Sequence, residues 1–283
     1  MISVLQLGTL DYPTGLRIQQ KLVDLRKEDR IGDVLLLLEH SPVITLGRNA
    51  KAANVTASPE KLSARGVEVF ESDRGGDVTF HGPGQLVGYP IFDLRAFPSS
   101  DTKRKTLGVI EYVRRLEELL IRACADFGIP AERVCGLTGV WTRSEAVELR
   151  STSTLRLRPG QARGDARRYT SESAKIAAIG VHVSRSVTSH GFALNVDTDL
   201  NYFDLIIPCG ITKPVTSMTR ELGKPPDLGE VTNSVVRNFG EVFQSQILWV
   251  ETLEALLGKA IGVPMKVPAE LRSIHGLEET FPV

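Results

Sequence analysis

The sequence predicts an α/β domain of the α+β type, in which helices flank a mixed, largely antiparallel sheet. Three observations predict it: segments with apolar residues at helical spacing, a short continuous apolar run typical of a buried strand, and two neighbouring β-rich runs. The chain has 283 residues, of which 42% are hydrophobic, so it can bury a complete core in one or two domains.

The first helix and strand are expected near the N-terminus. Leu16, Leu22 and Leu25 recur at roughly helical spacing. Residues 33–40 (DVLLLLEH) follow as a continuous apolar run that ends in charge. This order predicts a helix and then a buried strand.

The clearest helix is predicted over residues 107–127, followed by the helix-stopping Gly128 and Pro130. Its apolar side chains fall on one stripe: Leu107, Ile110, Val113, Leu116, Leu120, Ala123 and Phe127. Residues 175–184 and 190–198 are β-rich and separated by a short polar turn, which predicts a hairpin. A later helix should begin near Asp227, because Glu230 stands three residues after this capping residue.

Charge and cysteine content exclude several classes of protein. Lys plus Arg and Asp plus Glu both total 34, so no global charge favours nucleic acid or an anionic membrane. The start MISVLQLGTLDYP lacks the features of a signal peptide and no apolar stretch is long enough to span a membrane, so we expect a cytoplasmic protein. Three cysteines without metal-ligand spacing predict neither a metal site nor a disulfide framework, which leaves a reactive thiol.

The segment RGGDVTFHGPGQ (residues 74–85) concentrates four glycines, a proline, a histidine and an arginine. Glycine lets backbone amides approach a ligand closely, so this pattern is typical of a binding loop. The alternative is a hairpin connection, because residues 77–80 alternate as a strand does.

With a second block at residues 175–211, the chain resembles the lipoyl(octanoyl) transferases, acyltransferases that move an octanoyl group from acyl carrier protein to a lysine of lipoyl domains. The resemblance rests on EHSPVITLGR (39–48), RGGDVTFHGPGQLVGYPIFDL (74–94), GVWT (139–142), AKIAAIG (174–180), SHGFALNV (189–196) and PCGI (208–211). It implies a biotin/lipoate protein ligase-like fold. Octanoyl-acyl carrier protein is the implied donor; lipoyl domains of 2-oxoacid dehydrogenase E2 subunits and the glycine cleavage H protein are the implied acceptors. No cofactor is expected, and neither nucleic acid nor membrane as a partner.

The resemblance places the family's catalytic residues at Cys209 and Lys175. A thiolate exchanges readily with a thioester, and a neighbouring lysine could stabilise it and move protons. The acyl substrate is implied to lie against Arg74, Gly75, Gly76, Asp77, Val78, Thr79, Phe80, His81, Ala178, Ile179, Gly180, Gly191, Phe192 and Ala193. Arg74 could orient the loop or meet a phosphate.

Several roles stay open from the sequence. His81 fits either a hydrogen bond to the nucleophile or thioester, or a histidine satisfied within its loop; His40 fits either a pocket wall or a turn. Cys124 falls on the apolar stripe and is expected in the core, and Cys135, before Gly136, is expected to be structural. An ATP-dependent lipoate or biotin ligase on the same fold, which needs no cysteine, and a non-catalytic acyl-carrier-binding module remain the rival functions, although the biotin ligase pattern GRGRxG is absent.

The domain organisation predicted is a single acyltransferase domain over 1–248, with an inserted loop at about 143–173, and a C-terminal extension over 249–283. The insertion is rich in Arg, Ser and Thr, and family members join the flanking blocks by a much shorter loop. It is either a solvated excursion or a basic lip that helps to dock an acidic carrier protein. The extension is expected to hold a packed helix and an extended terminus.

Overall fold

The structure, a computed structural model, describes residues 1–143, 173–208 and 213–257. The predicted insertion and most of the predicted C-terminal extension lie outside these residues. The insertion's two flanks are nevertheless neighbours, because Trp141 is paired with Lys175 and the Thr142 amide donates to Ala174 O at 2.8 Å.

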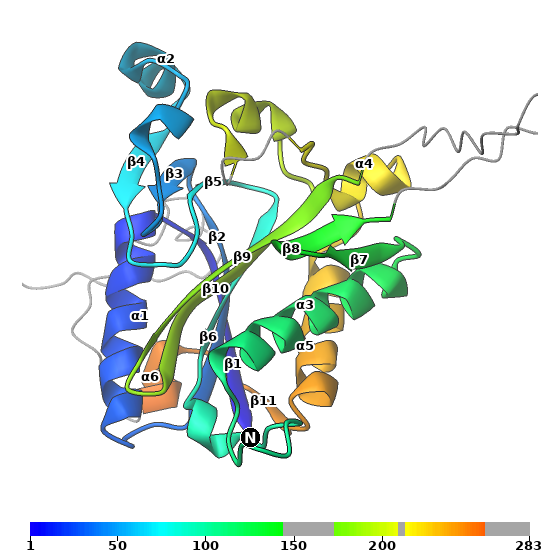
Figure 1. Ribbon diagram of the computed structural model, residues 1–283. Helices are drawn as coiled ribbons and strands as arrows, with labels where there is room; N and C mark the ends of the chain where they lie inside the picture. The colour runs from blue at the N-terminus through cyan, green and yellow to red at the C-terminus, as the bar shows by residue number, and fades with distance from the viewer. Residues whose placement is uncertain (144–172, 209–212, 258–283) are drawn as a thin grey trace, which may run out of the picture.

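An eight-stranded sheet forms the centre of the protein, in the order β11-β1-β2-β6-β10-β9-β8-β7 (Figure 1). The first strand, β1, runs parallel to both of its neighbours, whereas every other adjacent pair in this sheet is antiparallel. The prediction of a mixed, largely antiparallel sheet is therefore confirmed. The strands are β1 (Ile2–Leu10), β2 (Asp33–His40), β6 (Gln85–Ile91), β7 (Ala131–Val134), β8 (Leu137–Thr142), β9 (Lys175–Ser184), β10 (Val187–Asn195) and β11 (Ile247–Trp249).

Helices cover both faces of this sheet (Figure 1). On one face, α3 (Val109–Asp126) and α5 (Leu228–Val242) pack over the largest apolar cluster. On the other face, α1 (Tyr12–Lys27) and α6 (Leu253–Leu257) cover a second cluster. All three predicted helices are present, and the predicted start at Asp227 is correct, since its side chain accepts from Glu230 N.

The α3 stripe needs one correction. Leu107 is buried but precedes the helix, which is capped at Gly108, and Ile110 in the first turn is 80% exposed. Leu107 thus joins the core from outside the helix, whereas Ile110 lies outside the core. Cys124, further along α3, is completely buried as expected.

A second, three-stranded sheet, β4-β3-β5, stands at one end of the large one. Its elements are β3 (Val43–Leu46), β4 (Glu68–Glu71) and β5 (Val78–His81), with α2 (Pro59–Ala64) beside them; α4 (Met218–Leu222) and 3₁₀ turns at 52–54, 94–96 and 200–205 complete the described elements. Since β5 pairs with β3 while β6 pairs with β2 and β10, residues 82–84 connect two sheets. The hairpin alternative for the glycine-rich segment is thus wrong.

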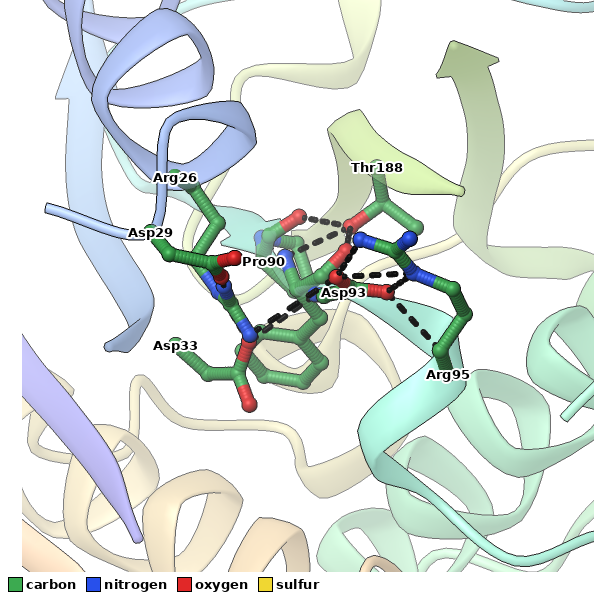
Figure 2. Close-up of polar contacts among 8 residues, drawn as sticks. Arg26, Asp29, Asp33, Pro90, Asp93, Arg95 and Thr188 are labelled. Carbon is green, nitrogen blue, oxygen red and sulfur yellow. Dashed lines mark hydrogen bonds and ion pairs between the residues drawn. The ribbon is translucent and has the colours of Figure 1, made fainter. Parts of the chain in front are cut away.

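A polar network stabilises the end of the large sheet that lies opposite the small sheet (Figure 2). Arg26, near the end of α1, donates to Asp33 at the start of β2 (2.9 Å), and the same carboxylate accepts from the Asp93 amide (2.9 Å). Thr188 of β10 bridges to Pro90 O of β6 at 2.7 Å. These bonds join α1, β2, β6 and β10 far from the glycine-rich loop.

The described part of the predicted C-terminal extension packs on the domain. Strand β11, which spans the predicted boundary at residues 248 and 249, pairs with β1, and Val250 N donates to Val4 O at 2.9 Å. Leu253 of α6 is buried in the cluster beneath α1. Residues 264–283, whose proline spacing predicts a packed helix and an extended terminus, lie outside the described residues.

Candidate active site

A cavity, here called the main cavity, opens between the start of the glycine-rich loop and the β9–β10 hairpin. Its empty space, including the part open to solvent, is about 470 Å³. The loop, both hairpin strands, α1, β5 and β6 line it, through Tyr12, Arg74, Gly75, Gly76, Thr79, His81, Tyr89, Ala178, Ile179, Gly180, His190, Gly191, Phe192 and Ala193.

The hairpin contributes small residues to this wall. Gly180 is paired with Gly191, and Ala178 with Ala193, so four minimal side chains stand together across two strands. Larger side chains at Ala178 and Ala193 would occupy cavity space, whereas a Cβ on Gly180 or Gly191 would meet the backbone oxygen of Gly75 or Gly88. The pairing explains why residues from two sequence blocks meet in one cavity.

Arg74 holds the loop in place. Its buried guanidinium donates from Nε to Thr45 Oγ1 at 3.0 Å and from Nη2 to Thr45 O at 2.6 Å. The Gly75 amide donates to Val181 O at 3.0 Å, which seats the loop on β9. Of the two roles predicted for Arg74, orienting the loop is thus directly visible in its contacts.

His81 is bonded within the protein and also faces the cavity. Its Nδ1 lies 2.8 Å from Gln85 Oε1. Because the Gln85 amide nitrogen donates to Asn195 Oδ1 at 2.8 Å, its oxygen must accept, so the proton sits on His81 Nδ1. Burial, with neighbouring His40, lowers the pKa of His81 to about 3, so the ring is neutral.

His40 lies behind the cavity wall rather than in a turn. It ends β2, is fully buried, and its ring nitrogens lie 3.0 Å from Leu10 O and 2.6 Å from Tyr89 Oη. Burial lowers the pKa of His40 to about 4. At neutral pH both imidazole rings are therefore uncharged: that of His81, on the cavity wall, and that of His40, behind it.

A second cavity, here called the lysine cavity, adjoins the first. It is lined by Thr79, Gln85, Lys175, Ala178, Ala193, Asn195, Phe203, Pro208 and Val215. Thr79, Ala178 and Ala193 line both cavities, so the two lie side by side.

Lys175 is held by its backbone and its side chain. Its N–H donates to Pro214 O at 2.8 Å, and its carbonyl accepts from Thr216 N at 3.0 Å. Its Nζ lies 4.8 Å from the centroid of the Trp141 ring, within range of a cation–π interaction. A Cβ on Gly139 would lie 3.5 Å from Lys175 Cε and only 2.6 Å from Ala177 O, so the close packing of β8 against β9 beside Lys175 requires a glycine here.

Three residues implied by the resemblance do not line either cavity. Val78 and Phe80 point into a separate apolar cluster under the small sheet, as alternation along β5 requires when Thr79 and His81 face the cavity. The Asp77 carboxylate accepts from Asn54 Nδ2 at 2.6 Å and from the Lys51 amide, and so fixes the neighbouring turn.

The two cysteines that the structure describes differ in their exposure to solvent. Burial raises the pKa of the Cys124 thiol to about 12, so this cysteine stays protonated and inert. Cys135 is exposed at the β7–β8 turn, away from both cavities. Cys209 lies outside the described residues, but Pro208, which precedes it in the sequence, lines the lysine cavity.

Tyr12, Tyr89 and His190 line the main cavity, although none was singled out from the sequence as a site residue. His190 and Tyr89 do lie within the blocks that carry the resemblance, which is the signal that could have found them. In the parts of the chain that the structure covers, no helix combines the length and apolar character needed to cross a membrane. Nor do these parts gather three or more metal-binding side chains around one point.

Comparison with known proteins places this architecture in a family. Residues 11–240 match the lipoyl protein ligase A/B catalytic domain. An octanoyltransferase of Koribacter versatilis (strain Ellin345) is 57% identical over 276 residues, 97% of each chain, and one of Acidobacterium capsulatum is 52% identical over 260 residues, 91% of this chain and 96% of the relative.

Solved structures agree on the fold. A bi-partite lipoate protein ligase from Thermoplasma acidophilum matches with a TM-score of 0.63 and 14% identity over 90% of this chain and 89% of its own. Lipoate-protein ligase A bound with ATP matches with a TM-score of 0.61 and 15% identity over 90% and 91%. These matches confirm the predicted lipoate protein ligase-like fold. By sequence, the chain belongs to the octanoyltransferases of the lipoyl protein ligase A/B catalytic domain family.

Proposed function

We propose that the protein transfers an octanoyl group from octanoyl-acyl carrier protein to the lysine of lipoyl domains, in lipoate biosynthesis, through an acyl thioester on Cys209. The acceptors are the lipoyl domains of 2-oxoacid dehydrogenase E2 subunits and the glycine cleavage H protein. The reaction takes place in the cytoplasm. The observation that carries the proposal is that the two cavities lie side by side and share three wall residues. A largely apolar space suited to an alkyl chain thus adjoins the cavity that Lys175 lines.

In the first step the Cys209 thiolate attacks the donor carbonyl, a new C–S bond forms, and the carrier's thiolate leaves and takes up a proton. In the second step the acceptor amine forms the amide bond, the C–S bond to Cys209 breaks, and the amine proton returns to sulfur. Lys175, whose ammonium is positioned over Trp141, supplies the charge beside the sulfur and exchanges these protons. Pro208 on the wall of the lysine cavity supports this placement.

The alkyl chain belongs in the main cavity, between the loop and the small residues of the hairpin. Three residues of its wall, Thr79, His81 and Ala193, are each less than 8% exposed, so a chain bound against them is shielded from bulk solvent on that side. Neither His40 nor His81 adds a charge that would oppose an apolar ligand.

The decisive test is intact-mass measurement after incubation with octanoyl-acyl carrier protein, without ATP or metal. One octanoyl adduct that hydroxylamine removes, and that Cys209→Ser lacks while Cys135→Ser retains it, is the expected result. An unchanged mass, or an adduct retained by Cys209→Ser, would exclude the thioester mechanism.

The rival function is an ATP-dependent ligase, since the fold is shared with a lipoate-protein ligase bound to ATP. A ligase would modify a lipoyl domain from free octanoate with ATP and would tolerate Cys209→Ser. A non-catalytic carrier-binding module would bind octanoyl-acyl carrier protein and modify no acceptor under either condition.

A further inference from the structure

The end of the main cavity remote from Lys175 is closed by aromatic side chains. His190 of β10 is paired with Val181, three residues beyond Ala178 along β9, or about 10 Å at the usual strand rise. This is the length scale of a medium-chain acyl group. The aromatic residues that line this end are each less than 5% exposed: Tyr12, Tyr89 and His190.

The backbone of His190 is unusual and directs its ring to this end. Strand alternation would place it on the same face as Phe192, which packs beneath α3 and α5. Instead φ is +55° at His190, and its ring lies 6.4 Å from that of Tyr89, which belongs to the opposite face. A residue with a side chain keeps such a conformation only where its surroundings hold it, and such sites cluster where ligands bind.

Two neighbouring residues hold the end wall from outside. The Asp73 carboxylate accepts from His190 Nε2 at 2.6 Å, and Ser72 Oγ accepts from the Tyr12 hydroxyl at 2.9 Å. The bond from His190 holds the pKa of Asp73 at about 2, so the carboxylate is ionised and the bond is charge-assisted. Gln19 of α1 accepts from the His190 amide at 2.8 Å and fixes its backbone.

We propose that Ser72 and Asp73, through Tyr12 and His190, form a clasp that closes the main cavity and sets the longest acyl chain the enzyme accepts. The inference rests on the proposed acyl transfer for its substrate class. His190 is the specificity-determining residue, because it lines the cavity. Asp73 is a positioning residue, because it acts through His190 from a side chain that is 59% exposed.

The test compares donors of 6 to 14 carbons in single-turnover acylation. Wild type should lose efficiency sharply beyond the length that reaches His190. In His190→Ala and Asp73→Ala, each further methylene can be buried at a gain of about fourfold, so the decanoyl-to-octanoyl ratio should rise on the order of fifteenfold. Asp73→Asn keeps an acceptor for His190 and should retain the wild-type limit.

Glu71→Ala is the matched control, since Glu71 is an exposed acid on β4 two positions before Asp73. It should leave both rate and chain-length profile unchanged. An unchanged profile in both His190→Ala and Asp73→Ala would overturn the clasp, as would a Glu71→Ala profile shifted as far as that of Asp73→Ala. If His190→Ala does not fold, the comparison of Asp73→Ala with Asp73→Asn tests the clasp by itself, because Asp73 is exposed and its variants should fold.

Binding of free hexanoate to tetradecanoate, measured by calorimetry, separates this proposal from the transfer reaction. A binding limit that Asp73→Ala extends supports the clasp even if no donor acylates the protein, in which case only the proposed function fails. Transfer with a length profile that none of the clasp variants alters overturns the clasp alone. Absence of both binding and transfer overturns both.

Discussion

Acid should destabilise this protein well above the range in which carboxylates titrate, because two imidazoles are buried in neutral form. The pKa of His40 is lowered to about 4 and that of His81 to about 3, chiefly by burial, from an ordinary value of 6.5. A folded-state pKa below the unfolded value gives stability that is complete above pH 6.5 and is lost as pH falls toward the folded value. At pH 5 the unfolded chain protonates both rings and the native protein neither.

The magnitude follows from the pH interval. Falling 1.5 units below 6.5 at about 1.4 kcal/mol per unit removes about 2 kcal/mol for each ring, or about 4 kcal/mol together. Domains have only about 5–15 kcal/mol of unfolding free energy, so this loss is a large part of it. Carboxylates such as Asp73, whose pKa is lowered to about 2 by the bond from His190, add their loss only below about pH 4.

The assay is urea unfolding at pH 7 and pH 5, for wild type, His40→Gln and His81→Gln. Each variant has its own packing cost at pH 7, so the quantity to compare is the change in unfolding free energy between the two pH values. This change should be smaller than in wild type by about 2 kcal/mol in each variant. Equal pH dependence in all three proteins would refute the assignment of buried neutral imidazoles.

Three further outcomes are expected. Lys175→Ala should lower octanoyl transfer by at least ~100-fold with the fold intact, and Lys175→Arg should recover little, because guanidinium does not exchange its proton; near-normal turnover of Lys175→Ala would contradict the role. Replacing residues 144–172 by a short Gly-Ser linker should leave the melting temperature nearly unchanged, because Thr142 and Ala174 already lie side by side; a large drop would show that the segment is structural, and a raised Michaelis constant for the carrier alone would favour the basic lip. Shortening the donor by two carbons should cost about 1.6 kcal/mol, on the order of fifteenfold in acylation efficiency, and a flat profile would exclude a length-measuring cavity.

The sequence predicted the elements whose hydrophobic pattern is uninterrupted. The α3 and α5 stripes and the β9–β10 hairpin meet this condition and were found. Strand β1 was not predicted: its pairing with β2 is irregular between Gln6 and Thr9, where Gly8 has φ of +64°, and this bulge breaks the alternation. The short strands β7 and β8 carry too few residues to show a period.

The site residues show the same contrast between those that the sequence could predict and those that it could not. Lys175 and the lining of the hairpin could be located because the resemblance carries them in contiguous blocks. Tyr12 and Asp73 could not be assigned a role, because they meet their partners Ser72 and His190 only through the tertiary fold, across 60 and 117 positions of sequence, and each has an ordinary local context. Val78 and Phe80 were included because a block was taken whole, whereas alternate residues of a strand face opposite sides.

Glycine does allow a close approach at the loop, but the groups that approach each other both belong to the protein: glycines of neighbouring segments contact the carbonyl oxygens of the loop. A Cβ on Gly180 would lie 2.7 Å from Gly75 O, and one on Gly47 would lie 2.4 Å from Gly76 O. Both contacts are with backbone, which cannot rotate aside. Gly180→Val, which would narrow the cavity if glycine only left room for a ligand, should therefore unseat the loop and impair every donor alike. Ala178→Val, at a partly exposed position that lines both cavities, is the variant expected to narrow the alkyl path and shift preference toward shorter donors.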